Sequence, residues 1–178
     1  MSEFQFEYDD VEQFPWLRQA GAAFQCGMVG EYEEASRLLR AMQQEHGAET
    51  VAGAIIAWID AALTFQGIND YGGTVALHFI NMDGDGDGAD NAPKEMVWAG
   101  RLFAARMADD REMFDAVINT IAGVDGKVVG DHVLAVLHTA VQLTLGNGRV
   151  KVGRRHHGTE RNTGENPRRF GQPWNGLS

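Results

Sequence analysis

The chain has 178 residues, of which 44% are hydrophobic, and its formal net charge is −10. That length suits a single domain, and the apolar content excludes a chain that is disordered throughout. The most apolar run, residues 51–63, is shorter than the roughly 20 residues that a membrane-spanning helix needs. We therefore expect no membrane insertion and a central buried helix over this run.

Two features favour a cytoplasmic location. The first ten residues, "MSEFQFEYDD", are acidic and lack the basic and apolar regions of a secretory signal. Cys26 is the only cysteine, so the chain cannot form an internal disulfide, which fits a reducing compartment.

The N-terminal segment, residues 1–14, is acidic and aromatic. Within it, residues 3–8 ("EFQFEY") alternate polar with aromatic side chains, a period that indicates a short strand or a docking peptide. Residues 74–80 ("TVALHFI") fit a strand and a short helix equally well, and the two segments could pair as a minor sheet.

Three helices are predicted over residues 15–67. The clearest is residues 31–45, whose apolar side chains recur at helical spacing and form one stripe. Helical patterns at residues 15–28 and 51–65 flank it. Pro15 stands where a first helical turn tolerates proline, and Gly67 stands where helices commonly stop. These residues form the first three-helix half.

The glycine- and aspartate-rich segment, residues 81–91, is the candidate ion site. Counted from Asp83, carboxylates at positions 1, 3 and 5 and a glycine at position 6 match the first half of an EF-hand calcium loop. Position 12 is Lys94, where a bidentate glutamate should complete the coordination. A shorter calcium site remains as an alternative, with the ligands Asp83, Asp85, Asp87 and Asn91. The favoured interpretation is a flexible linker between the two halves, with no cofactor.

A second helical triplet follows over residues 92–146, with patterns at 93–107, 110–122 and 128–145. Residues 20–33 align with 99–112 at a shift of 79, with identities such as Phe24 with Phe103, and the third helices align best at a shift of 78. We interpret the body, residues 15–148, as an internal duplication. The predicted fold is all-α, a compact bundle of about six helices from two three-helix repeats, with an extended C-terminal arm.

The helices carry no recognisable catalytic motif. His132 and His138 are six residues apart on one predicted helix, so they face different sides and cannot form the paired ligands of a metalloprotease. Asp60 and His138 match at the shift of 78 and could meet as an acid/base pair, although ordinary polar contacts are the favoured interpretation. We expect no catalytic residue and no enzymatic activity.

Charge separates the body from the tail. Residues 1–148 carry 8 Lys/Arg against 23 Asp/Glu, whereas residues 149–178 carry 7 against 2. The tail also loses the hydrophobic period, which predicts a poorly structured arm. Its arginines stand near aromatic residues, a combination that suits either a protein groove or nucleic acid. The predicted partner-binding residues are Arg154, Arg155, Arg161, Arg168, Arg169, Phe170 and Trp174.

These observations predict a non-catalytic interaction factor, an adaptor, assembly or regulatory protein that docks a protein partner, or a second copy of itself, through the arm. One alternative is a nucleic-acid-associated accessory protein that uses the same arm, although the acidic body opposes DNA binding. Another is a helical protein modulated by calcium through the aspartate loop.

Overall fold

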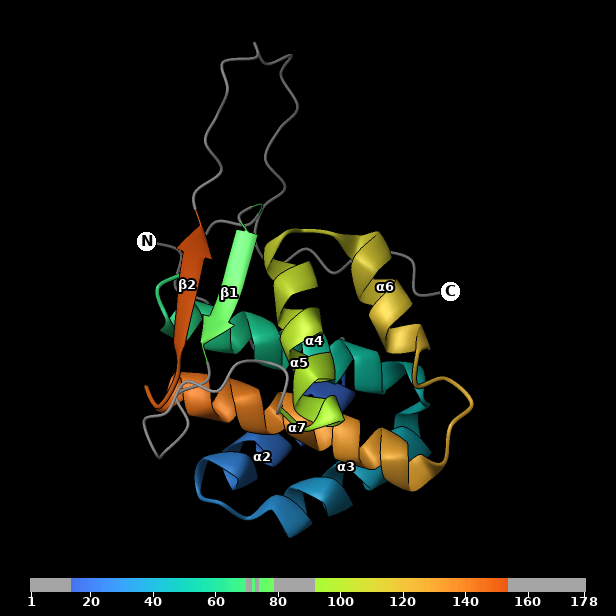
Figure 1. The fold of residues 1–178 in the computed structure, drawn as a ribbon. Helices are drawn as coiled ribbons and strands as arrows, with labels where there is room; N and C mark the ends of the chain where they lie inside the picture. The colour runs from blue at the N-terminus through green and yellow to red at the C-terminus, as the bar shows by residue number, and fades with distance from the viewer. Residues whose placement is uncertain (1–13, 70–71, 73, 79–91, 154–178) are drawn as a thin grey trace.

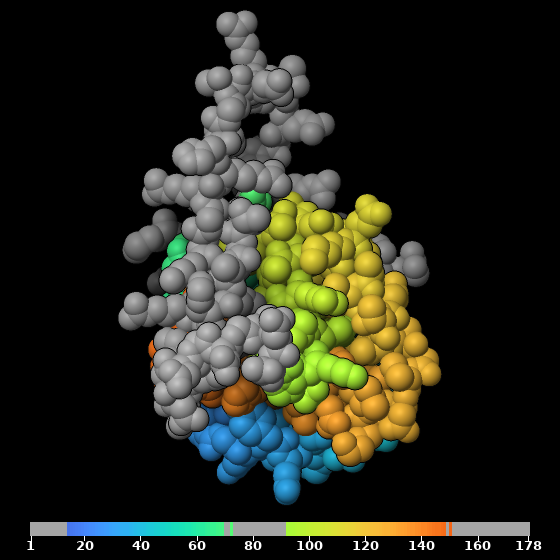
Figure 2. Space-filling view, viewed as in Figure 1, coloured from blue at the N-terminus to red at the C-terminus, as the bar shows by residue number. Residues whose placement is uncertain are grey.

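The computed structural model describes residues 14–69, 72, 74–78 and 92–153, and within them the chain folds as two successive runs of three helices (Figure 1). The six helices are α2 (Trp16–Met28), α3 (Tyr32–His46), α4 (Glu49–Phe65), α5 (Lys94–Met107), α6 (Arg111–Asn119) and α7 (Gly126–Thr144). In the space-filling view, the second run, yellow-green to orange, packs directly on the blue helices of the first (Figure 2). The predicted helical bundle is confirmed. Among the described residues, no helix is both long and apolar enough to cross a bilayer.

Central helices α4 and α7 pack against each other, helices α2, α3 and α5 cover them, and α6 packs on α5. The expectation of a buried helix over residues 51–63 is confirmed, because Ile55, Ile59 and Leu63 of α4 are almost fully buried. Gln66, directly after α4, donates from Nε2 to the carbonyl oxygen of Leu143 near the end of α7 at 2.6 Å. The C-terminal ends of the two central helices are therefore joined.

The turns after α2 and α5 have the same construction at a spacing of 79 residues. Gly30 and Asp109 each adopt a positive φ, 82° and 53°. The next backbone N–H, of Glu31 and Asp110, then donates to the carbonyl five residues earlier, at 2.8 and 2.9 Å. This hydrogen bond is the Schellman arrangement that ends a helix. Equivalent turns at equivalent positions support the duplication.

Helices α4 and α7 also end alike. Gly67 and Gly146 have φ values of 74° and 77° and are again 79 residues apart. At this shift Asp60 corresponds to the buried Thr139 rather than to His138. The shift of 78 that best aligns the apolar residues therefore differs by one residue from the shift that relates the helix ends.

A small antiparallel sheet lies beside α5 and consists, in the described part of the chain, of β1 (Thr74–His78) and β2 (Arg149–Gly153). Thr74 lies opposite Gly153 and His78 opposite Arg149. The assignment of residues 149–153 to an unstructured arm is wrong, because their backbone pairs with a strand more than 70 residues earlier in the sequence. The expected pairing of residues 74–80 with residues 3–8 lies outside the described residues.

Candidate functional site

The predicted site residues fall outside the part of the chain that the structure describes. The four calcium ligands lie in residues 79–91 and all seven partner-binding residues in 154–178, so both sets remain predictions. Within the described residues, no group of three or more histidine, cysteine or acidic side chains is placed to hold a metal ion. The body offers two other polar arrangements, a buried ion pair and a tyrosine–histidine pair.

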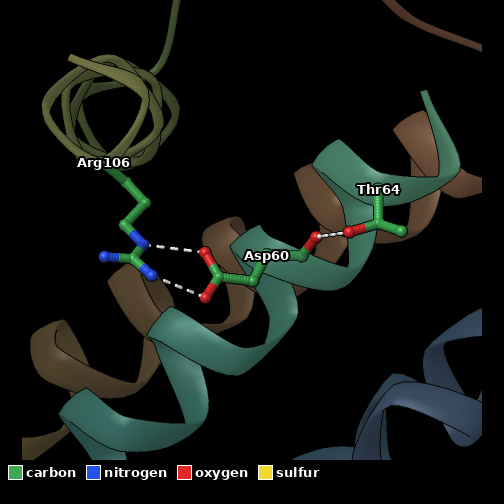
Figure 3. Close-up of polar contacts among 3 residues, drawn as sticks. All are labelled: Asp60, Thr64 and Arg106. Atoms are coloured by element: carbon green, nitrogen blue, oxygen red, sulfur yellow. Dashed lines mark hydrogen bonds and ion pairs between the residues drawn. The ribbon is translucent and has the colours of Figure 1, made fainter. Parts of the chain in front are cut away.

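The buried ion pair joins the two halves of the body through Asp60 of α4 and Arg106 of α5 (Figure 3). Arg106 donates from Nε and from one terminal nitrogen to the two carboxylate oxygens, both at 2.7 Å. The two side chains are only 7% and 8% exposed. Thr64, one turn along α4, donates its hydroxyl to the Asp60 carbonyl oxygen at 2.8 Å. The carboxylate is thus held in a bidentate pair that fixes α5 on α4.

Sequence reasoning noticed Asp60 but missed its partner. Arg106 follows Leu102 by four residues on the apolar face of α5, and Asp60 interrupts the apolar face of α4. A charge of opposite sign on the apolar face of each of two helices is the signal that could have found the pair. At the shift of 79 the equivalent of Arg106 is Gly27, and a Cβ there would lie 3.0 Å from Val141 of α7. Helix α2 thus meets α7 at the position where α5 meets α4. Close apolar packing holds the first contact, and an ion pair holds the second.

The second arrangement joins Tyr32, the first residue of α3, to His138 of α7. The Tyr32 hydroxyl and the His138 Nδ1 lie 2.9 Å apart, with the ring centroids 5.5 Å apart. Burial raises the pKa of the Tyr32 hydroxyl, and a hydrogen bond with Gln142 opposes this shift. Burial also lowers the pKa of the His138 imidazole. Both shifts favour the uncharged forms, so the pair is neutral at pH 7.

A chain of side-chain hydrogen bonds orients this pair. Asn147 donates from Nδ2 to Oε1 of Gln142 at 3.0 Å, which leaves the amide nitrogen of Gln142 to face the Tyr32 hydroxyl. The same hydroxyl lies within hydrogen-bond distance of Nδ1 of His138, so Asn147, Gln142, Tyr32 and His138 form one connected series of polar contacts. His138 and Asp60 do not form the acid/base pair that the sequence analysis disfavoured. Each side chain instead makes an ordinary interhelical polar contact, with Tyr32 and with Arg106 respectively. His132 lies elsewhere, with its ring edge-on to Trp98 at 5.3 Å between centroids.

An open groove surrounds the tyrosine–histidine pair. One part, about 1070 Å³, lies along α3 from the turn at Gly30 to Arg40. A second part, about 330 Å³, lies between the start of α5 and α7 and is lined by His138. Tyr32 and Leu134 line both parts, so the two parts adjoin. We call this surface the α3–α7–α5 groove.

Carboxylates outnumber cations around the groove. Its lining includes two arginines, Arg37 and Arg40, and five acidic residues, Glu31, Glu33, Glu34, Glu95 and Asp131. Glu34 is paired with Arg37, and Asp131 with Lys127 at 2.8 Å. Within the described part of the chain, no salt bridge involves the other three carboxylates. The lining therefore carries a net negative formal charge.

The described residues thus form a helical bundle with one small two-stranded sheet, an open groove lined mainly by acidic residues, and a buried interhelical ion pair. The chain matches no protein-family model, no curated protein and no solved structure.

Proposed function

We propose that the chain is a non-catalytic interaction factor of the cytoplasm, an adaptor, assembly or regulatory protein that docks a protein partner through residues 154–178. The observation that carries the proposal is the charge contrast on either side of Gly153. The body up to this residue is acidic, whereas the 25 residues after it contain five arginines and two glutamates. Phe170 and Trp174 add aromatic side chains of the kind that anchor protein interfaces.

The described body supports a structural rather than a catalytic use of its polar groups. Arg106 holds the buried Asp60 carboxylate through two short hydrogen bonds. Tyr32 and His138 form a neutral pair that joins α3 to α7. The groove beside them is wide and open, a shape that suits an extended peptide better than an enclosed small molecule.

The test uses full-length protein as bait in a lysate of the native host. We compare the wild type with a variant carrying Arg168→Glu, Arg169→Glu and Trp174→Ala, and with a matched control carrying Asn162→Ala and Thr163→Ala. A partner retained by the wild type and the control but lost with the variant, and rebound as a purified protein, supports the proposal. Equal retention by all three baits overturns it.

Nucleic-acid binding is the second candidate, because paired arginines beside aromatic residues also suit a phosphate backbone with stacked bases. Neutralising about five phosphates would give a slope of about −4 to −5 for log K against log salt on duplex DNA. Absorbance at 260 nm in the purified protein, removed by nuclease, distinguishes this candidate from a protein partner.

A further inference from the structure

The α3–α7–α5 groove combines an apolar floor with an acidic rim. Leu134 and Ala135 of α7 and Met96 of α5 line it with apolar side chains, and Tyr32 contributes an aromatic ring. Leu134 and Met96 are only partly buried. Such a surface suits an extended segment that presents both aromatic and cationic groups.

The carboxylates that form no salt bridge with a described residue line both parts of the groove. Glu31 and Glu33 stand at the start of α3, and Glu95 stands in the first turn of α5. A ligand that binds across the groove meets carboxylates on either side. Arginine is the side chain that pairs best with them, because its planar guanidinium binds carboxylates in a bidentate manner.

The chain itself supplies a segment with this chemistry. Residues 168–174 ("RRFGQPW") place two arginines beside Phe170 and end at Trp174. Arg168 stands 15 residues beyond Gly153, a reach of up to about 50 Å for an extended chain. A domain of this size is about 40 Å across. The tether is therefore longer than the body is wide, which brings the segment within range of a groove on its own chain.

We infer that residues 168–174 bind in the α3–α7–α5 groove of the same chain, with Arg168 and Arg169 at its carboxylates and the two aromatic rings on its apolar floor. A tether of this length gives an effective concentration in the millimolar range, so binding within one chain exceeds binding between chains at micromolar protein. A partner must then displace the segment, which makes the body a regulator of its own docking arm. The regulatory part of this inference rests on the proposed function, whereas the binding site itself does not.

The experiment is disulfide trapping in the full-length chain. In a Cys26→Ser background, one cysteine is placed in the segment as Gly171→Cys and a second in the groove as Ser36→Cys. The matched control replaces the second with Ala116→Cys on the exposed face of α6, which does not line the groove. We expect the groove variant to form an intramolecular disulfide at least about tenfold faster than the control, because the bound segment holds its cysteine at a high local concentration.

The dependence of the trapping rate on salt and on the charge at residue 33 provides a second readout. Raising the salt from about 0.1 to 1 M shortens the Debye length from about 10 to 3 Å and should remove most of the rate advantage. Glu33→Arg should slow trapping at Ser36→Cys and leave trapping at Ala116→Cys unchanged. Because Glu33 is exposed, this change does not disturb the core.

Three outcomes would overturn the inference. Equal trapping rates in the two variants would show that the segment does not prefer the groove, and insensitivity to salt and to Glu33→Arg would show that the carboxylates do not attract it. Disulfide-linked dimers in place of monomers would assign the groove to a second copy of the chain. The lysate experiment tests the proposed function independently. Equal retention by the three baits would overturn the proposed function, whatever the trapping rates are.

Discussion

Removing Arg106 tests whether the buried ion pair holds the two halves together. Arg106→Met keeps an unbranched side chain and leaves the Asp60 carboxylate, 7% exposed, without its two 2.7 Å hydrogen bonds from the guanidinium. Breaking a buried pair from one side costs about 3–5 kcal/mol. For a domain of this size each kcal/mol lowers the melting temperature by about 2–4 °C, so the expected decrease is about 6–20 °C.

A double variant separates the free energy of the ion pair itself from the cost of leaving one buried charge unpaired. Combining Arg106→Met with Asp60→Leu removes both charges, so its stability should lie close to that of the wild type or exceed it by about 1–4 kcal/mol. Urea unfolding followed by circular dichroism at 222 nm gives the four free energies of the cycle. A cost below about 1 kcal/mol for Arg106→Met, the value for solvent-exposed pairs, would refute the reasoning. Additive losses in the double variant would refute it as well.

Three further predictions concern the rest of the chain. Because burial lowers the pKa of His138, the unfolded chain binds the proton more tightly, so the native state should lose stability as pH falls below about 6.5, the ordinary histidine value. His138→Gln should show a smaller loss of melting temperature between pH 8 and pH 5, and an unchanged loss would contradict this assignment. Gly53→Ala would place a Cβ 2.6 Å from the Trp16 ring, so it should destabilise by about 1–3 kcal/mol in urea unfolding. Its control, Gly21→Ala, has open space around the Cβ and should stabilise α2 by up to about 1 kcal/mol. If residues 83–91 are only a linker, melting temperatures in calcium and in EDTA should agree, whereas a higher value in calcium would establish an ion site.

Local signals in the sequence were sufficient to predict the helices. Pro15 precedes α2, and Gly67 and Gly146 adopt the positive φ that closes α4 and α7. Each of these helix-end signals depends on one residue and its immediate neighbours, so the sequence alone could locate the helix ends. The small sheet could not be predicted in this way, because β2 is a five-residue strand whose pairing depends on the distant β1.

The polar contacts were less predictable for the same reason. Tyr32 falls on the apolar stripe predicted for residues 31–45, yet its hydroxyl lies within hydrogen-bond distance of His138, 106 residues away. Periodicity shows which face of a helix is buried but not which residue of another helix it meets. The pairing of Asp60 with Arg106 depends on how α5 crosses α4, and no spacing along the chain encodes that crossing.

Each half of the body packs a helix on the central helix of the other half, and this arrangement affects how the chain folds. Arg106 of the second half binds α4 of the first, whereas Gly27 of the first half lies against α7 of the second. Neither central helix is covered by its own half alone, so the α4–α7 pair must form across nearly 80 residues of sequence. Closing so long a loop costs entropy before any packing offsets it, and folding slows as contacts become less local. The body should therefore fold in one cooperative step that is slower than expected for a bundle with only local contacts.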